Sequence, residues 1–222
     1  MNRIRVGLGA GRVLLLVSAA LVVNSSVPVS QAQGEVPPIP DPVPVTLDPA
    51  TTALLVEDLF QTPCGLGVAV ANCTALVPQV ASLLAAARDA GVFVLFSWST
   101  SDVPIADDVA PLPGEVVFQG AQPYGQDRFF QTPLDELLQE RGVMTVILVG
   151  WRANGGILYS SFGAAMHGYT VVVPVDGTSG GRSEQAAIGF YQMLDHVAGN
   201  PTNEPLKERA VTLTRTDLIS FR

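Results

Sequence analysis

Two apolar runs separated by a stretch of small residues form the clearest pattern in the chain. Residues 143–149 and 169–174 are uncharged and rich in β-branched side chains, which is typical of strands buried on both faces of a parallel sheet. Between these runs, Ile157, Phe162 and Met166 recur at helical spacing, and Gly168 is positioned to end a helix. The pattern predicts a strand–turn–helix–strand unit with a right-handed crossover.

The same alternation continues on both sides of this unit. Strands are predicted at residues 52–58, 92–97, 115–118 and 210–214, and helices at 74–90, 133–141 and 183–198. Thr74 and Thr132 are expected to cap the first two of these helices. Strands that alternate with helices predict an α/β domain, here a doubly wound, mostly parallel six-stranded sheet with helices on both faces.

The first 32 residues have the pattern of a secretory signal peptide. Three arginines accompany an apolar segment at 13–23 that is short for a membrane span, and a small-residue cleavage site ends at Ala32. An uncleaved membrane anchor is the alternative. We expect a proline-rich linker at 33–49 and one domain at 50–222, in a protein that is secreted or periplasmic.

The net charge of the chain limits the classes of molecule that it is expected to bind. The whole chain has a formal net charge of −8, and removal of residues 1–32 leaves nine basic residues against 20 acidic ones, or −11. This acidity argues against nucleic acids and anionic membranes, both of which bind basic patches. We expect a small-molecule ligand, with anions among the candidates, and homo-oligomerisation stays open.

The two cysteines of the chain, Cys64 and Cys73, lie close together in the sequence. In an exported protein this spacing predicts a local disulfide. A metal site is not expected, because the chain has only two histidines, His167 and His196, and neither has a local His or Cys partner. No cofactor is expected.

The central unit carries a motif that resembles a known family. Gly150 and Asn154 follow a buried strand, and Gly-Tyr-x-Val-Val-Val-x-x-Asp follows the helix at residues 168–176. This arrangement is similar to that of the isochorismatase-like cysteine hydrolases. The resemblance implies a nucleophilic cysteine at the start of the helix, where the helix dipole lowers the thiol pKa. The matching position is Gly156, so the nucleophile is missing.

The resemblance also implies roles for residues outside the central unit. Asp58 takes the place of the family's general base. The family's catalytic lysine has no counterpart, since Lys207 is the only lysine, and Arg128 is the nearest cation. The alternatives are that Asp58 caps a turn and that Arg128 forms a surface ion pair with Asp127 or Asp135.

These residues are expected to meet at one edge of the sheet. Ligands of open α/β sheets bind beyond the carboxyl ends of the strands, where the chain order reverses. Glycines in the turn would let a ligand approach backbone amides, although they also suit a plain tight turn. The candidate catalytic residues are Asp58 and Arg128, and the candidate substrate-binding residues are Trp151, Asn154, Gly155 and Gly156.

Two functions remain open. One is a non-standard or inactive hydrolase homologue that binds a small molecule around Asp58. The other is an active hydrolase or lyase in which Asp58 activates water or abstracts a proton, while Arg128 and backbone amides hold an anion. Ser160 could replace the cysteine only if it pointed back into the crevice, and no histidine is placed to activate it. Loss of the cysteine and the lysine favours the first function.

Overall fold

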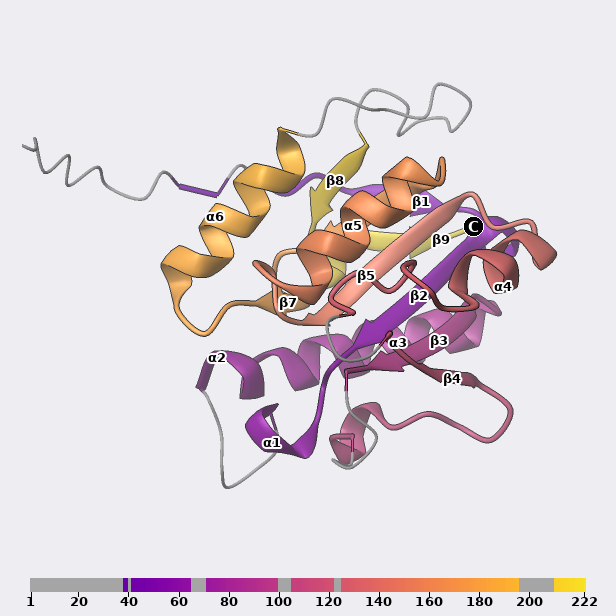
Figure 1. Cartoon of the computed structure of the whole chain (residues 1–222), viewed down its shortest axis with the longest axis horizontal. Helices are drawn as coiled ribbons and strands as arrows, with labels where there is room; N and C mark the ends of the chain where they lie inside the picture. Colours follow the sequence, from indigo (N-terminus) through magenta and orange to yellow (C-terminus); the bar gives the residue numbers. More distant parts are fainter. Residues whose placement is uncertain (1–37, 40, 65–70, 100–104, 122–124, 196–209) are drawn as a thin grey trace, which may run out of the picture. The chain divides into compact units, whose positions relative to one another are not determined.

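A seven-stranded parallel sheet with helices on both faces forms the core of the domain (Figure 1). The computed structural model describes residues 38–39, 41–64, 71–99, 105–121, 125–195 and 210–222. The strands are β1 (Val45–Leu47), β2 (Thr52–Glu57), β3 (Phe93–Trp98), β4 (Val116–Gln119), β5 (Thr145–Trp151), β6 (Thr170–Pro174), β7 (Thr178–Ser179), β8 (Val211–Thr214) and β9 (Ile219–Phe221). The α-helices are α1 (Gln61–Cys64), α2 (Ala71–Thr74), α3 (Leu76–Ala90), α4 (Leu134–Glu140), α5 (Gly156–Met166) and α6 (Ser183–Leu194).

The order of the strands places β2 beside β5. The sheet runs β4-β3-β2-β5-β6-β8, and β7 pairs with the end of β5. From β2 the chain proceeds outward through β3 to β4, and from β5 it proceeds in the other direction. The order therefore reverses between β2 and β5, where Glu57 lies opposite Gly150 in register. This is the point at which α/β sheets bind ligands.

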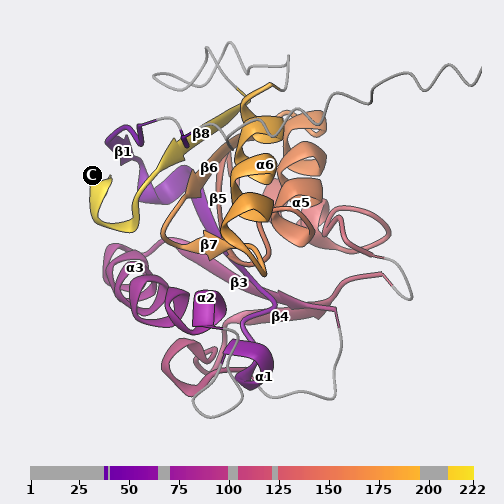
Figure 2. The same ribbon diagram turned by 90° about the vertical axis from the view of Figure 1, so that its left-hand side faces the viewer.

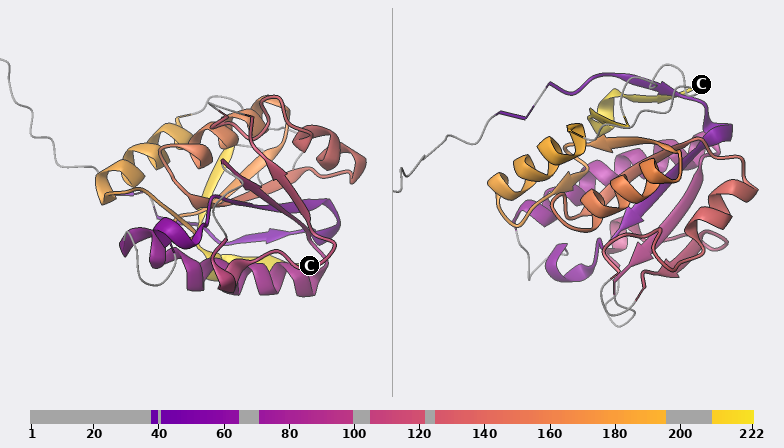
Figure 3. Two further views of the ribbon diagram at one scale, coloured as in Figure 1. Left: turned by 60° about the horizontal axis from the view of Figure 1, so that its bottom comes forward. Right: turned by 45° about the horizontal axis from the view of Figure 1, so that its top comes forward.

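Each face of the sheet has its own apolar core. Helices α4, α5 and α6 cover one face, and α3 covers the other, as Figures 2 and 3 show. Along β2, Ala53 and Leu55 face α5, whereas Leu54 and Val56 face α3. Because side chains alternate along a strand, Glu57 continues the row that faces α5. This alternation brings a carboxyl group into an otherwise apolar layer.

The predicted fold class is confirmed, and the strand count differs in detail. The structure adds β7, which has two residues, to the six predicted strands of the sheet. It also adds β1, within the segment predicted as linker, which pairs in parallel with β9 as a separate two-stranded sheet. Such short strands have little pattern of their own, and each depends on a partner that is distant in the sequence.

Two predicted helix caps are wrong. Thr74 ends α2, and α3 begins at Leu76 with Ala75 as an N-cap that makes no side-chain hydrogen bond. The N-cap of α4 is Pro133, although Thr132 Oγ1 still accepts the Leu134 amide at 3.3 Å. The predicted helix at 183–198 ends at Leu194, and residues 196–198 lie outside the described residues.

The predicted signal peptide and the first part of the predicted linker lie outside the described residues. The described end of the linker runs along β8, where the Val43 amide donates to the Leu213 carbonyl at 3.1 Å and Thr214 Oγ1 donates to the Val43 carbonyl at 2.7 Å. Among the described residues, no helix has the length and apolar character needed to cross a membrane. The domain boundaries stay predictions.

Candidate functional site

Strand β2 leads into two consecutive carboxyl side chains, Glu57 and Asp58. Asp58 has a φ of 52°, a left-handed conformation that is uncommon for residues other than glycine. Its amide donates to the Ser97 carbonyl at 3.1 Å, and its Oδ1 accepts the Ser99 amide at 2.6 Å. These bonds hold the strained residue at the carboxyl edge of the sheet, beside the end of β3.

Arg128 is a fully buried cation that joins both carboxyl groups. Its Nη2 donates to Asp58 Oδ2 at 2.5 Å, and its Nε lies 3.6 Å from Glu57 Oε2. Its Nη1 donates to the Gly125 carbonyl. The guanidinium therefore forms a buried ion pair with Asp58 and not the surface pair considered as an alternative.

The start of α5 lies directly against this group. A Cβ atom at Gly156 would lie 2.9 Å from Glu57 Oε2 and 3.7 Å from Arg128 Nη2. The structure thus brings Asp58, Arg128 and Gly156 together at one point, and Arg128 joins the other two. We call Glu57, Asp58 and Arg128, with the adjoining Gly156, the acid cluster.

The other residues of the turn contribute unequally. Asn154 is half-buried, and its Oδ1 is buried without a hydrogen-bond partner among the described residues. At Gly155 a Cβ atom would lie 3.3 Å from Gln126 Oε1, so this glycine permits a close approach. The Trp151 carbonyl lies 3.6 Å from the Cβ position of Gly156, whereas the Trp151 ring packs in the core on the α3 face. The acid cluster therefore meets the backbone of Trp151 and not its ring.

Glu57 belongs to the acid cluster, although it is not among the site residues predicted from the sequence. Its side chain is 0% exposed, and neither carboxyl oxygen has a hydrogen-bond partner in the described chain. Burial raises its pKa to about 7, Arg128 lowers the pKa only in part, and Asp58 raises it further. The available signal was an acid at the end of a strand predicted to be buried on both faces, where a charge cannot reach water.

The other carboxyl groups near Arg128 also hold their protons more tightly than usual. Burial raises the pKa of Asp58, against the opposing effects of Arg128 and the Ser99 amide. Burial likewise raises the pKa of Asp127, which accepts the Phe129 amide at 2.9 Å. Three carboxyl groups thus lie near one arginine. Their possible negative charges outnumber its positive charge in a region that is largely shielded from water.

Of the hydroxyl groups at the start of α5, only Ser160 faces the acid cluster. Its Oγ is fully buried and accepts the Arg128 amide at 3.1 Å. The hydroxyl lies near enough to Glu57 to lower its pKa, although neither carboxyl oxygen receives a hydrogen bond of normal geometry. Ser161 donates to the Leu158 carbonyl at 2.7 Å within the helix, and Tyr159 is 51% exposed.

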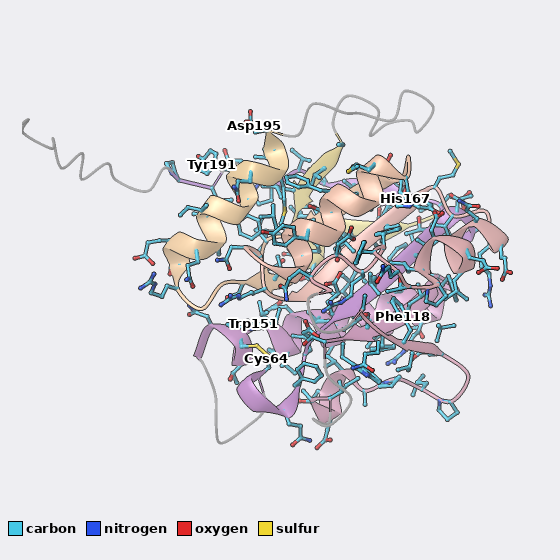
Figure 4. All side chains as sticks on the ribbon, viewed as in Figure 1. Cys64, Phe118, Trp151, His167, Tyr191 and Asp195 are labelled. Atoms are coloured by element: carbon cyan, nitrogen blue, oxygen red, sulfur yellow. A yellow bond between two sulfur atoms is a disulfide. The ribbon has the colours of Figure 1, made fainter. Side chains whose placement is uncertain are left out.

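No histidine is placed to activate Ser160 in the described part of the chain. His167 lies at the other end of α5 (Figure 4) and is its C-cap. Its Nδ1 lies 2.9 Å from the Gly163 carbonyl, and its ring stacks on Phe129. A serine nucleophile requires an adjacent base. Ser160 therefore lacks the partner that a serine hydrolase would need, other than the carboxyl group of Glu57.

The predicted disulfide is present. Cys64 and Cys73 are bonded, and they join α1 to α2 just beyond Asp58. Figure 4 shows Trp151 above Cys64, and both residues belong to the core on the α3 face. The two cysteines are the only ones in the sequence, so no thiol is available at the acid cluster. The described residues contain no group of His, Cys, Asp or Glu that could hold a metal ion.

The chain belongs to the isochorismatase family, since a family model described as the isochorismatase domain matches residues 52–203. The chain is 33% identical over 150 residues to the maleamate amidohydrolase of Pseudomonas putida, which covers 54% of this chain and 68% of that protein. It is 28% identical over 160 residues to the ureidoacrylate amidohydrolase RutB of Methylobacterium radiotolerans. That match covers 51% of this chain and 61% of the relative, so it spans less than two thirds of the relative's length.

The same architecture occurs in solved structures. An isochorismatase family protein from Desulfovibrio vulgaris superposes with a TM-score of 0.62 and 22% identity, covering 75% of this chain and 95% of that one. At this identity the likeness establishes the fold alone. The family is therefore shown by the sequence match, and the chemistry of this chain depends on its own site residues.

Proposed function

We propose that this protein is an exported member of the isochorismatase family that has lost thiol-dependent hydrolysis and binds a small molecule at the acid cluster. The observation that carries this proposal is Gly156, which lies against Glu57 and Arg128 where the family resemblance implies a cysteine. Glycine supplies neither a nucleophilic atom nor a charge.

Loss of the thiol removes the main catalytic contribution. In catalytic units that act together, removal of the nucleophile typically lowers turnover on the order of 10⁶-fold. The two cysteines of this chain are joined to each other, so neither can replace the missing one. The lysine implied by the resemblance is also absent, and Arg128 is the cation that lies against Asp58 and Glu57. Arginine and lysine are not interchangeable in such a role.

Retention of a binding site is supported by features that stability alone does not explain. Asp58 keeps a strained backbone conformation, and Glu57 is buried with no hydrogen bond of normal geometry to either oxygen. An unsatisfied buried polar group costs about 1–3 kcal/mol. Such costs concentrate at functional sites, where a ligand or water supplies the missing partner.

A second candidate function is water activation by a carboxyl group, and Glu57 is a better base for it than Asp58. Asp58 is already engaged by Arg128 at 2.5 Å and by the Ser99 amide. Glu57 has free acceptor oxygens and a pKa of about 7, close to the value at which a general base works best at neutral pH. This role would replace the one that the sequence suggested for Asp58.

Ammonia release from maleamate and ureidoacrylate tests both candidates. We expect no turnover above background before or after treatment with iodoacetamide, and we expect a ligand that raises the melting temperature of the wild type to stabilise Asp58→Asn less. Turnover that iodoacetamide abolishes would contradict the proposal. Turnover that survives iodoacetamide and disappears in Glu57→Gln would support the second candidate.

Export is a separate part of the proposal and has its own test. The basic and apolar segment at residues 1–32 and the Cys64–Cys73 bond support it, because disulfides persist in oxidising compartments. Mass spectrometry of the secreted or periplasmic fraction is expected to show a chain that begins near Gln33. A full-length chain that stays with the membrane would support the anchor alternative instead.

A further inference from the structure

The acid cluster has more negative than positive charge. Arg128 pairs with Asp58 at 2.5 Å and lies farther from Glu57, at 3.6 Å from Nε to Oε2. The described groups that act on the charge of Glu57 are Arg128, Asp58, Asp127 and the Ser160 hydroxyl. Because Asp58 already matches the charge of Arg128, ionised Glu57 is a buried anion without a cation of its own.

The unpaired atoms around Glu57 are mostly hydrogen-bond acceptors. Both oxygens of Glu57 lack a hydrogen bond of normal geometry, and so does the buried Ser97 Oγ, which can donate or accept. Ser97 lies opposite Glu57 in the β2–β3 register, and side chains that are paired in this way point to the same face. Apart from the Ser97 hydroxyl, the unpaired donor on this side among the described residues is Arg128 Nε. A molecule that completes these bonds must therefore mainly donate hydrogen bonds.

The space at the acid cluster restricts the size of such a molecule. Glu57 and Arg128 have no exposed side-chain surface, and Asp58 exposes 11% of its side chain. The Glu57 carboxyl group also lies against Gly156, where a Cβ atom would be only 2.9 Å away. The group of a ligand that reaches Glu57 must therefore be small, because the side chains of the acid cluster and the start of α5 enclose the carboxyl group.

We propose that the ligand of the acid cluster is a small protonated amine whose ammonium group donates hydrogen bonds to Glu57. This inference rests on the proposed function, which makes the acid cluster a binding site. An ammonium group supplies three donors and one positive charge, and both properties match what Glu57 lacks. Hydrogen bonds between charged groups are roughly twice as strong as neutral ones.

The same charges argue against an anionic ligand, which the sequence left among the candidates. Two like charges in close contact repel each other more strongly in a desolvated site than in water. An anion beside ionised Glu57 would incur this repulsion, and the charge of Arg128 is already matched by that of Asp58. The site therefore discriminates by charge, in favour of the cation.

Titration of the full-length protein with methylammonium chloride, followed by NMR, tests the inference. At pH 8 we expect saturable shifts of the Glu57, Ser97 and Gly156 amides. At pH 5.5 we expect roughly 30-fold weaker binding, because protonation of a group with a pKa of about 7 removes most of the anion. Glu57→Gln is expected to weaken binding at least tenfold, and Glu140→Gln, which changes an exposed acid, is the matched control.

Sodium formate at the same ionic strength tests whether the acid cluster binds an anion instead of a cation. The variant Asp58→Asn tests the effect of removing the acid that is paired with Arg128. This variant leaves Arg128 without its closest partner, so we expect formate to bind the variant at least tenfold more tightly than the wild type. Saturable formate binding to the wild type without methylammonium binding would overturn the inference and leave the binding function standing. Methylammonium binding that is unchanged in Glu57→Gln would also overturn it. If neither probe binds and no other small molecule stabilises the protein, the binding function itself fails.

Discussion

Two arginine–carboxylate clusters lie at opposite ends of the strands of the same sheet, at the amino edge and the carboxyl edge. They differ in the number of carboxyl groups that share one arginine. At the amino edge, Arg88 donates from Nε and Nη2 to the two oxygens of Glu115, each at 2.8 Å. Arg88 also donates to the Ala110 carbonyl, and Glu115 accepts the Leu112 amide. At the carboxyl edge, Arg128 serves two acids, and Glu57 receives no hydrogen bond from the described chain.

The difference shows in the protonation of the acids. Burial raises the pKa of Glu115, but hydrogen bonds from Arg88 and Leu112 outweigh it, and the net pKa is lowered. Burial also raises the pKa of Glu57, and Arg128, shared with Asp58, does not offset it. A cavity of about 330 Å³ adjoins the Arg88 pair, yet every charged group of that pair has its partners. A matched pair of this kind stabilises the fold, whereas an unmatched acid is available for chemistry.

Removal of each arginine is expected to give the largest contrast between the clusters. Arg128→Met should lower the free energy of unfolding by about 3–5 kcal/mol, because it leaves two buried carboxyl groups without a cation. Arg88→Met, at a pair whose side chains are 22% and 15% exposed, should lower it by about 1 kcal/mol. Urea denaturation at pH 8 measures both values. Equal losses would show that the two clusters are energetically alike.

The pH dependence of stability should have opposite signs at the two acids. Glu57 has a raised pKa in the folded state, so its contribution is fully present below about pH 4.5 and is lost as the pH rises to about 7, on the order of 3 kcal/mol in total. Glu57→Gln should therefore flatten the wild-type decline between pH 5 and pH 8.

Glu115→Gln is the counterpart of that variant. Because the pKa of Glu115 is lowered in the folded state, its contribution is present above its unfolded pKa and is lost as the pH falls through the folded pKa. The variant should be less stable than the wild type at pH 8 and should approach it in acid. Urea midpoints from pH 3 to pH 8 test both signs, and a wild-type decline that persists in Glu57→Gln would contradict the assignment to Glu57.

Reduction of the disulfide should affect the carboxyl edge more than the amino edge. The bond closes a loop between Cys64 and Cys73, and its loss should lower stability by about 2–3 kcal/mol in the chain-entropy model. Hydrogen exchange should increase at Ser99, whose amide is held by Asp58, and not at the Leu112 amide, which is held by Glu115. Intact mass after alkylation tests the bond directly, and two freely alkylated thiols in native, unreduced protein would refute it.

Reintroduction of a thiol at the acid cluster is expected to have the smallest effect. Gly156→Cys should lower stability by about 1 kcal/mol, because its Cβ would lie 2.9 Å from Glu57 Oε2. The nearby carboxylates should raise the pKa of the new thiol and keep it unreactive. Gly156→Ala is the matched control for steric effects. Amide turnover by Gly156→Cys that iodoacetamide abolishes would show that the acid cluster still supports the family's chemistry.

The sequence by itself was sufficient for the α/β fold class and for the edge of the sheet at which the site lies. Buried parallel strands have local apolar runs, and the helices between them have local periodicity, so both can be predicted without tertiary contacts. Asp58 and Gly156 follow two such strands, and the carboxyl ends of parallel strands share one edge. The Cys64–Cys73 bond was predictable from spacing for the same local reason.

Only the tertiary structure decided how the charges are matched. Arg128 reaches Asp58 across 70 positions of the chain, and no local pattern specifies that approach. The choice of Glu57 as the unpaired acid depends on which face of β2 meets α5, and its raised pKa depends on complete burial. The pairing of β1 with β9 was likewise decided by contacts between residues that are distant in the sequence. Desolvation and ion pairing are properties of the packed molecule, because the free energy of a charge depends on everything that surrounds it.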